Sequence, residues 1–368
     1  MAKFRKTPTE AEIVDLLRRG EVQLRPFSLT VEEAGAADDD GIDAFVRLDW
    51  GQKRVRFVAE CRRLWTPKAV AEMASRIRRF ARPPEFYPMV VVPYLPDARL
   101  AELESQGVSG IDLSGNGIVV VPNELLVCRT GSPNQFRAEA AIKNVFRGES
   151  SLVARSFLAV PEYESVQDAR REIERRGGSV ALSTVSKVCK SLESLLVIER
   201  KKGAGSAARQ LKLLQPDKLL DLLAENYVAP AVTRNARGKS KLPAEALGNA
   251  LSRGKKRGVR VAQTGLGSVG SYAVMAKEPV QYFYCSDLDA ALAALGSDFE
   301  ATERFANVTL SETRDDTVYF DARPGLVASP VQVYLELMTG DKRTRETAEQ
   351  VRRVILEPLG TAGSARND

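Results

Sequence analysis

One stretch of the sequence restricts the fold more than any other: ALSTVSKVCKSLESLLVIERKKGAGSAARQLKLLQP, residues 181–216. Ser183 is a suitable helix N-cap, because its hydroxyl can accept a hydrogen bond from a free backbone N–H. Apolar residues then recur at helical spacing, at Val185, Val188, Leu192 and Leu195. The apolar run LLVIER, the glycine-broken tip KKGAGSAAR and the returning run QLKLL follow. The pattern predicts a helix followed by a two-stranded antiparallel hairpin.

Two further helices are expected before this stretch, within SSLVARSFLAV and ESVQDARREIERRGG. The order helix, helix, turn, helix and two-stranded wing is that of the winged helix-turn-helix, which we assign to residues 148–228. In that fold the last helix reads the major groove of DNA and the wing contacts phosphates. The outward residues of the recognition helix are Thr184, Ser186, Lys187, Lys190 and Ser191, and the basic residues of the wing are Lys201, Lys202 and Arg209.

A second interpretation stays open for the same residues. Exposed lysines also solvate ordinary surface helices, and a winged helix can serve as a protein-binding surface. We favour double-stranded DNA as the partner because the helix and the wing are both basic. The net charge of +6 agrees with a polyanionic partner.

Residues 1–130 show a different pattern, in which strand-like runs alternate with helix-like ones. A helix is expected in TEAEIVDLLRRG, then a hairpin of IDAFVRLDW and KRVRFVAEC, then a helix that begins near Pro67. The apolar strand PMVVVPY, the helix PDARLAELESQG and the runs GIDLSGNGIVVVP and ELLVCRTG complete the module. This alternation indicates an α/β sandwich.

The order helix, hairpin, helix, strand resembles the restriction-endonuclease-like, or PD-(D/E)xK, fold. That resemblance implies carboxylates on neighbouring strands that hold a magnesium ion and a water. The matching residues are Asp43, Glu60 and Arg62, and Lys68 could supply an ammonium group from a shifted position. Arg62 departs from the family pattern, because it stands where lysine is expected and cannot give up a proton. We therefore favour a nuclease fold kept as a scaffold over an active magnesium-dependent nuclease.

The rest of the chain is expected to contain a linker and a third module. Residues 229–243, APAVTRNARGKSKLP, combine basic residues with proline and glycine, as an exposed basic linker does. Residues 244–360 are expected to form a small C-terminal α+β domain. A second basic patch is expected at Arg253, Lys255, Lys256 and Arg257. The whole chain is therefore predicted to be an α+β multidomain protein.

A literal G-x-G-x-x-G lies in RVAQTGLGSVGSYAV, at Gly265, Gly267 and Gly270. In a dinucleotide-binding fold this motif joins a strand to a crossover helix that returns to a parallel strand. Only the segment between Gly270 and Pro279 could form such a helix here, and it is too short to cross a sheet. We expect close packing of a short helix against a strand, and no cofactor.

Composition removes several kinds of chemistry. The chain has no histidine, which excludes serine–histidine and cysteine–histidine catalysis and histidine metal sites. Its four cysteines are far apart, at Cys61, Cys128, Cys189 and Cys285, and are expected to be buried reduced thiols. No run approaches the roughly 18 apolar residues of a membrane span. A cytoplasmic protein with no membrane contact is expected.

Three stretches together resemble the AbiEi-family antitoxins of bacterial type IV toxin–antitoxin systems: GVSGIDLSGNGIVVV, LSTVSKVCKSLESLLVIER, and RVAQTGLGSVGSYAV with LVASPVQVYLELM. In that family the TGL run, here Thr264 to Leu266, opens the last domain, and the run from Ser329 to Leu337 introduces its closing helices. The resemblance implies a DNA-binding autorepressor with a cognate toxin protein. A homodimer is expected, because such regulators read paired half-sites. The alternative function is a Mg²⁺-dependent DNA nuclease of a defence system, targeted by its winged helix.

Overall fold

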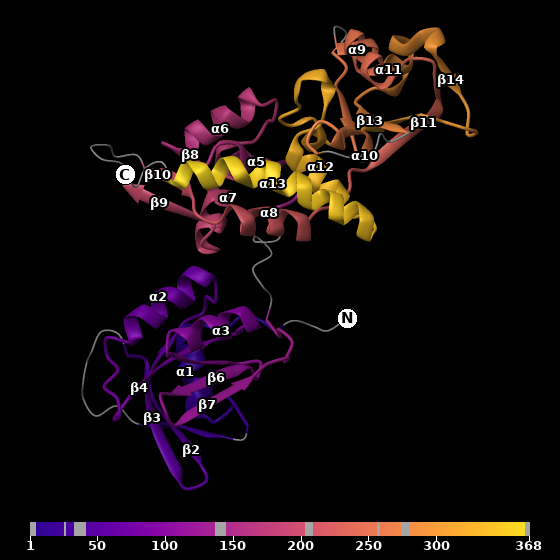
Figure 1. The fold of residues 1–368 in the computed structure, drawn as a ribbon. Coiled ribbons are helices and arrows are strands. Elements are labelled where there is room, and N and C mark those ends of the chain that lie inside the picture. Colours follow the sequence, from indigo (N-terminus) through magenta and orange to yellow (C-terminus); the bar gives the residue numbers. More distant parts are fainter. Residues whose placement is uncertain are drawn as a thin grey trace. The chain divides into compact units, whose positions relative to one another are not determined.

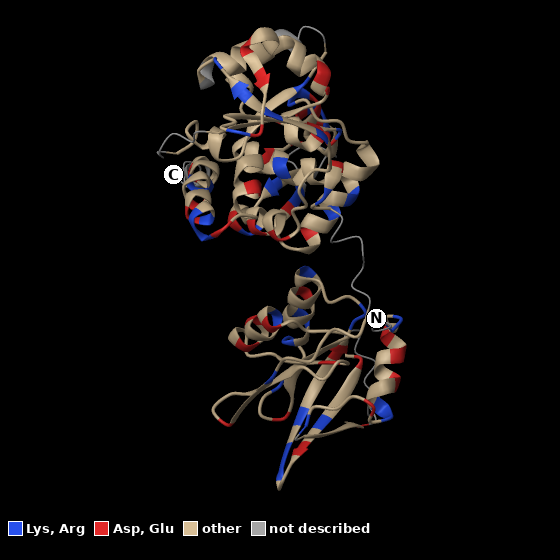
Figure 2. Cartoon of the chain, turned by 90° about the vertical axis from the view of Figure 1, so that its right-hand side faces the viewer, with Lys and Arg blue, Asp and Glu red and all other residues tan. Residues whose placement is uncertain are grey.

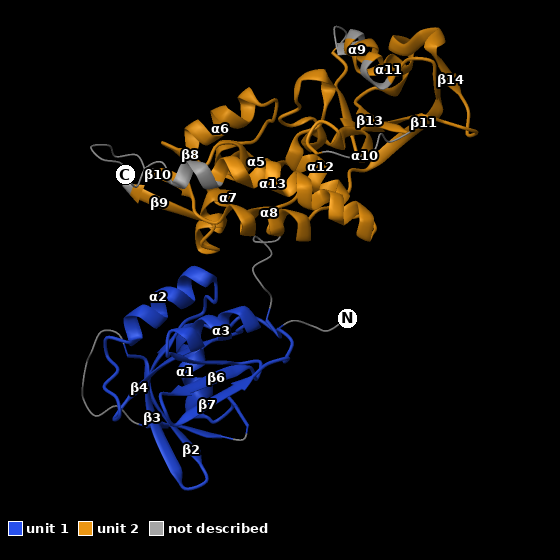
Figure 3. Cartoon of the chain, viewed as in Figure 1, with its two compact units in different colours: residues 1–140 blue, residues 141–368 orange. Residues whose placement is uncertain are grey.

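The chain folds into two compact units. The computed structural model describes residues 5–25, 27–32, 42–136, 145–202, 209–255, 258–273 and 280–364. Unit 1 comprises residues 1–140 and unit 2 residues 141–368 (Figure 3). Both combine helices with sheets, so the expected α+β class is confirmed. The described helices include none that is long and apolar enough to cross a membrane.

Unit 1 is built on one seven-stranded mixed sheet whose spatial order follows the sequence (Figure 1). Its strands are β1 (Ser28–Glu32), β2 (Ala44–Trp50), β3 (Lys53–Cys61), β4 (Tyr87–Val92), β5 (Ser109–Asp112), β6 (Gly117–Val121) and β7 (Leu125–Arg129). The strands β3, β4 and β5 run parallel, and the other neighbours are antiparallel. The expected hairpin β2–β3 is confirmed, whereas β1 was not predicted.

Helices cover both faces of this sheet. Helix α1 (Glu10–Arg18) buries Ile13 and Leu17 in the apolar core on one face. Helices α2 (Pro67–Ile77) and α3 (Asp97–Ser105) contribute to a second core on the other face. Pro67 stands in the first turn of α2, as expected, where its missing N–H costs no hydrogen bond. The α/β layering predicted for this module is therefore present.

Unit 2 begins with a helical core beside a small sheet. Its helices are α5 (Ser151–Ala159), α6 (Val166–Arg175), α7 (Leu182–Ser194) and α8 (Pro216–Glu225). The strands β8 (Glu162–Tyr163), β9 (Ile198–Lys202) and β10 (Arg209–Leu213) form an antiparallel sheet in the order β8-β10-β9. The three helices and the hairpin predicted here are present, whereas helix α8 and the two-residue strand β8 were not predicted.

The last two helices join this same core instead of forming a separate domain. Helix α12 (Pro330–Leu337) packs on α8, and α13 (Lys342–Ser364) packs on α5 and α8 (Figure 1). Tyr334 and Val351 are buried in one cluster with Phe157 and Leu220. The expected domain boundary at residue 244 is therefore wrong for this part of the chain.

A five-stranded sheet occupies the other part of unit 2. Its order is β12 (Val261–Thr264), β13 (Gln281–Cys285), β15 (Val308–Thr313), β11 (Val232–Ser240) and β14 (Phe299–Ala301). Helices α9 (Ala244–Lys255) and α11 (Leu288–Leu295) share a core with one face of this sheet. The linker expected at residues 229–243 is wrong, because most of it is strand β11, which lies between two other strands.

The G-x-G-x-x-G run does not form a dinucleotide-binding unit. Strands β12 and β13 that flank it are antiparallel, whereas the dinucleotide fold needs parallel strands. The short helix α10 (Leu266–Val269) lies inside the motif. Gly265 has φ of +60°, and a side chain on Gly267 would collide with Gln281. Both glycines therefore serve local packing, as expected.

Three of the four cysteines follow the prediction. All are free thiols, and Cys61, Cys189 and Cys285 are buried. Cys128 is exposed on the edge strand β7, so the expectation that it is buried is wrong. Its position in an edge strand explains the difference, since one face of such a strand meets solvent.

Candidate nucleic-acid interface

Helix α7 presents a polar face away from the core. Its apolar positions Val185, Val188 and Leu192 are buried as predicted, and Cys189 joins them, whereas Leu195 is only partly buried. Lys187 and Lys190 are exposed, and Thr184, Ser186 and Ser191 are partly exposed. The helix starts two residues earlier than predicted, so that Ala181 is the N-cap and Ser183 lies inside the first turn.

Hydrogen bonds from neighbouring elements hold α7 in place. The Arg200 guanidinium on β9 forms an ion pair with the Glu193 carboxylate of α7, at 3.3 Å. The Lys218 ammonium of α8 donates to the Leu195 carbonyl at 2.8 Å, and the Gln215 amide donates to the Leu196 carbonyl at 2.6 Å. The last two bonds satisfy carbonyl groups at the end of α7 and join it to the start of α8.

The charges of α7 differ from those of α6. The arginines of α6 are paired within the helix: Arg171 with Asp168, Arg170 with Glu174 and Arg175 with Glu172. Across the described residues, the Lys187 and Lys190 ammonium groups form no ion pair within 4 Å. Basic and acidic residues are interspersed over unit 2 (Figure 2), so unpaired cations on one helix face are a local feature.

Strands β9 and β10 form an antiparallel hairpin, as the sequence predicted. Arg209 lies opposite Lys202 in the register of the two strands, so both residues lie at the same end of the hairpin. Lys201 is exposed, and its ammonium contacts the Glu199 carboxylate at 2.8 Å. The tip at 203–208 and the side chains of Lys202 and Arg209 lie outside the described residues.

The second basic patch is only partly described. The backbone of Arg253 and Lys255 lies in the last turn of α9, next to the five-stranded sheet. Their side chains, and both Lys256 and Arg257, lie outside the described residues. This patch therefore stays a prediction.

In unit 1 the structure brings the two predicted carboxylates to the same end of the β2–β3 hairpin. Ala44 pairs with Ala59 in the antiparallel register, so the next residues outward, Asp43 and Glu60, lie opposite each other. The Asp43 carboxylate is exposed and accepts a hydrogen bond from the Cys61 N–H at 2.7 Å. Glu60 is fully buried, on the side of α2.

Two guanidinium groups bind the Glu60 carboxylate. Arg62 contacts Oε1 at 3.0 Å, and Arg76 on α2 donates to Oε2 at 2.9 Å and also binds Oε1. Arg62 in turn contacts Glu10 at 2.8 Å. A metal ion at Glu60 would have to displace at least one of these groups. Lys68 is partly buried at the start of α2.

Arg76 was missed from the sequence. It lies on the α2 surface between buried Met73 and Ile77, where an arginine looks like any solvated helix residue. Only the packing of α2 on β3 shows that it reaches Glu60. The residues with described positions include no cluster of three or more Asp, Glu or Cys that could hold a metal ion.

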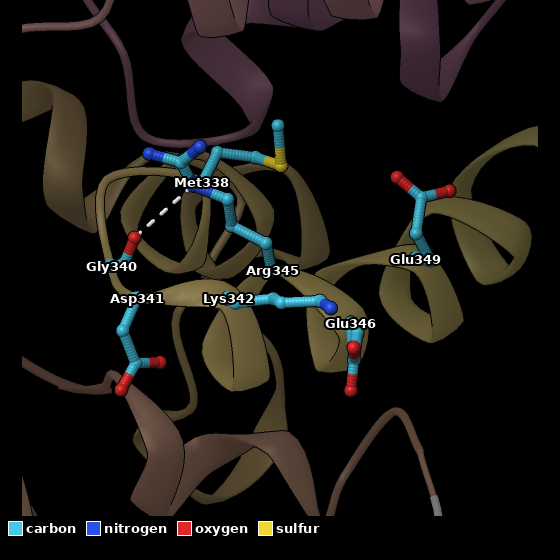
Figure 4. A pocket seen from close by; sticks show the side chains of 7 residues that line it. All are labelled: Met338, Gly340, Asp341, Lys342, Arg345, Glu346 and Glu349. Carbon is cyan, nitrogen blue, oxygen red and sulfur yellow. Dashed lines mark hydrogen bonds between the residues drawn. The ribbon is translucent and has the colours of Figure 1, made fainter.

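A hollow of about 540 Å³ lies at the turn between α12 and α13 (Figure 4). It carries both signs of charge, with Lys342 and Arg345 beside Asp341 and Glu346. The Arg345 guanidinium donates to the Gly340 carbonyl at 3.1 Å and so belongs to the turn itself. This surface carries three carboxylates against two cations and has no buried polar group among its lining residues, which separates it from the basic face of α7.

Comparison with known proteins gives no relative for this chain. No family model matches it, and neither the curated proteins nor the solved structures contain a significant match.

Proposed function

We propose that the protein is a sequence-specific, double-stranded-DNA-binding transcriptional regulator that uses residues 148–228 as a winged helix-turn-helix. The element order α5, β8, α6, α7, β9, β10, with β8 paired to β10, supports this assignment. The observation that carries the proposal is the exposed face of α7, where Lys187 and Lys190 have no counter-charge among the described residues.

The proposed contacts divide into two kinds. Thr184, Ser186, Lys187, Lys190 and Ser191 would face base edges and adjacent phosphates in the major groove. Lys201, Lys202 and Arg209 would grip phosphates beside it, which gives affinity without sequence preference. The pairing of Lys201 with Glu199 lowers what that lysine can add.

The resemblance to AbiEi-family antitoxins extends this proposal. It supports an autorepressor that binds DNA upstream of its own gene, as a homodimer, and that has a cognate toxin protein as partner. Two of the sequence runs on which this resemblance depends contact each other in unit 2. Thr264 and Gly265 of the TGL run both donate hydrogen bonds to Glu336, which lies in the run from Ser329 to Leu337.

The test is a gel-shift titration of the full chain on a duplex from its own upstream region. We expect Lys187→Ala and Lys190→Ala each to weaken specific binding by about 1 kcal/mol or more, because each removes an unpaired cation from the groove-facing helix. Lys202→Ala is expected to weaken binding to all duplexes alike and to flatten the salt dependence.

Lys342→Ala is the matched control, because it removes the same charge from an exposed position on α13. If Lys342→Ala weakens binding as much as Lys187→Ala does, only net charge matters and the groove assignment is wrong. Indifference of binding to all the α7 and wing variants would remove the proposal itself.

The alternative function, a Mg²⁺-dependent nuclease, is not favoured by the geometry of unit 1. Both oxygens of Glu60 are bound by arginines, and Arg62 cannot serve as a proton donor or acceptor. We therefore propose that the restriction-endonuclease-like module acts as a scaffold, and the same duplex incubated with Mg²⁺ is expected to stay intact.

A further inference from the structure

A small, partly open cavity lies at the edge of the helical core of unit 2, lined by α5, α12, α13 and the segment before α12. Its volume is about 170 Å³. Leu158, Phe320, Val331 and Ile355 give it apolar walls, and Arg155 is part of its lining. Roughly 150 Å³ is enough to hold a benzene-sized molecule. The space therefore suits a compact ligand that is mostly apolar.

Arg155 brings a positive charge into this apolar space. Only 4% of the residue is exposed. Its Nη1 donates to the Thr317 carbonyl at 3.1 Å and to Gln332 Oε1 at 2.7 Å. Its Nε is buried and has no hydrogen-bond partner among the described residues. A buried donor of this kind costs free energy unless a ligand or water satisfies it.

No carboxylate in the described structure pairs directly with Arg155. Burial lowers the pKa of its guanidinium, although Tyr227, Asp315 and Glu336 at longer range oppose that shift. Glu336 is held by other donors, namely Thr264, Gly265 and Gln332. The cation thus lacks the close anion that buried arginines normally have.

The other ionisable residues of the lining leave the cavity positive. They are Asp321 and Arg323. The Asp321 carboxylate is bound by Arg176 and lies 3.5 Å from Arg323, so it is already neutralised.

We propose that this cavity is a binding site for a small organic monocarboxylate with a compact apolar body, whose carboxylate meets Arg155. The apolar walls take the body of the ligand, and the buried guanidinium supplies the charge-assisted hydrogen bond that distinguishes an acid from a neutral molecule of the same shape. The site is independent of the DNA-binding proposal, since none of its residues lies on the exposed face of α7.

The test uses the full chain and three probes: benzoate, benzyl alcohol as its neutral counterpart, and inorganic phosphate. Binding is measured by isothermal titration calorimetry. We expect benzoate to bind with a Kd in the millimolar range or below and benzyl alcohol to bind at least about tenfold more weakly, because it lacks the charge. Phosphate, which has no apolar body, is expected not to bind at this site.

Two variants locate the binding. Arg155→Met is expected to remove the preference for benzoate over benzyl alcohol. Ala159→Leu fills the cavity from the partly exposed end of α5 while keeping the Arg155 guanidinium, and is expected to abolish binding of both aromatic probes. The control Lys342→Ala, in the other hollow, is expected to bind benzoate as the unchanged protein does. If Arg155→Met does not fold, Ala159→Leu decides.

Four results would overturn the proposal, of which the first three concern the aromatic probes. They are no benzoate binding at about 10 mM, equal affinity for benzoate and benzyl alcohol, and full benzoate affinity in Ala159→Leu. Binding of phosphate with an affinity equal to that of benzoate would also overturn it, because the apolar walls would then have no role.

Discussion

Asp112 shows how one residue can hold a turn together. Its Oδ1 accepts hydrogen bonds from the N–H groups of Ser114, Gly115 and Asn116 at 2.7–2.8 Å. Its Oδ2 accepts from the Leu95 N–H at 2.9 Å and from the Asn116 amide at 2.8 Å. In the run GIDLSGNG, the buried Asp112 carboxylate therefore accepts hydrogen bonds from donors on several sides and holds the turn between strands β5 and β6.

We expect Asp112→Asn to destabilise unit 1 by about 2–3 kcal/mol, because an amide places a donor where only donors converge. The chain has two tryptophans, Trp50 and Trp65, both in unit 1, so their fluorescence in a urea titration reports this unit alone. Asp97→Asn is the matched control, an exposed carboxylate at the start of α3, and should change stability by only a few tenths of a kcal/mol. Equal effects of the two substitutions would refute the role given to Asp112.

Arg62 decides between the two interpretations of unit 1. Arg62→Lys restores the literal E-x-K spacing with Glu60. We expect this variant still to leave duplex DNA intact in Mg²⁺, since Arg76 continues to bind both oxygens of Glu60. Cleavage by Arg62→Lys that requires Mg²⁺ and disappears when Glu60→Ala is added would show that the site is a nuclease only one residue from activity.

At the scale of elements, the strongest periodic patterns predicted the structure well. The helix α7, the hairpin β9–β10 and the hairpin β2–β3 each have an apolar repeat that matches one period. Strand β11 was mistaken for a linker because VTRNARGKS has almost no apolar alternation. Its place is set by partners on both sides, and Gly238 allows the close approach of Phe299, whose ring would meet a Cβ at 2.4 Å. Such pairing is tertiary and leaves little trace in composition.

The candidate sites were predicted to different degrees for the same reason. Lys187 and Lys190 could be found because outward positions of an amphipathic helix follow from its own sequence. Arg76 and Arg155 could not, since their partners are far away along the chain. One local signal for the buried network did exist: Gln332 and Glu336 are one turn apart in the otherwise apolar PVQVYLEL. Polar residues at that spacing on an apolar helix indicate a shared buried hydrogen bond, and Gln332 donates to Glu336 at 2.6 Å.

At the scale of the whole molecule, the helical core of unit 2 is discontinuous in sequence. It combines residues 145–223 with residues 318–355, and Ala262 and Val269 join it from the intervening segment, which forms most of the five-stranded sheet. The two parts are also joined by polar bonds, since Arg155 donates to Thr317 and Gln332, and Arg352 pairs with Asp217. A winged helix-turn-helix of residues 148–228 is therefore not expected to be an independent domain.

This organisation predicts the behaviour of two fragments. Residues 145–364 should unfold in one cooperative thermal transition, because they contain the complete core. Residues 145–228 should show no such transition by far-UV circular dichroism, because removal of α12 and α13 exposes the apolar faces of α5 and α8 and leaves the buried Arg155 without its acceptors. A sharp transition of the short fragment at the temperature of the long one would show that the closing helices are dispensable. If the short fragment lacks the transition and also fails to bind DNA, whereas the long fragment binds, the closing helices are required to present α7.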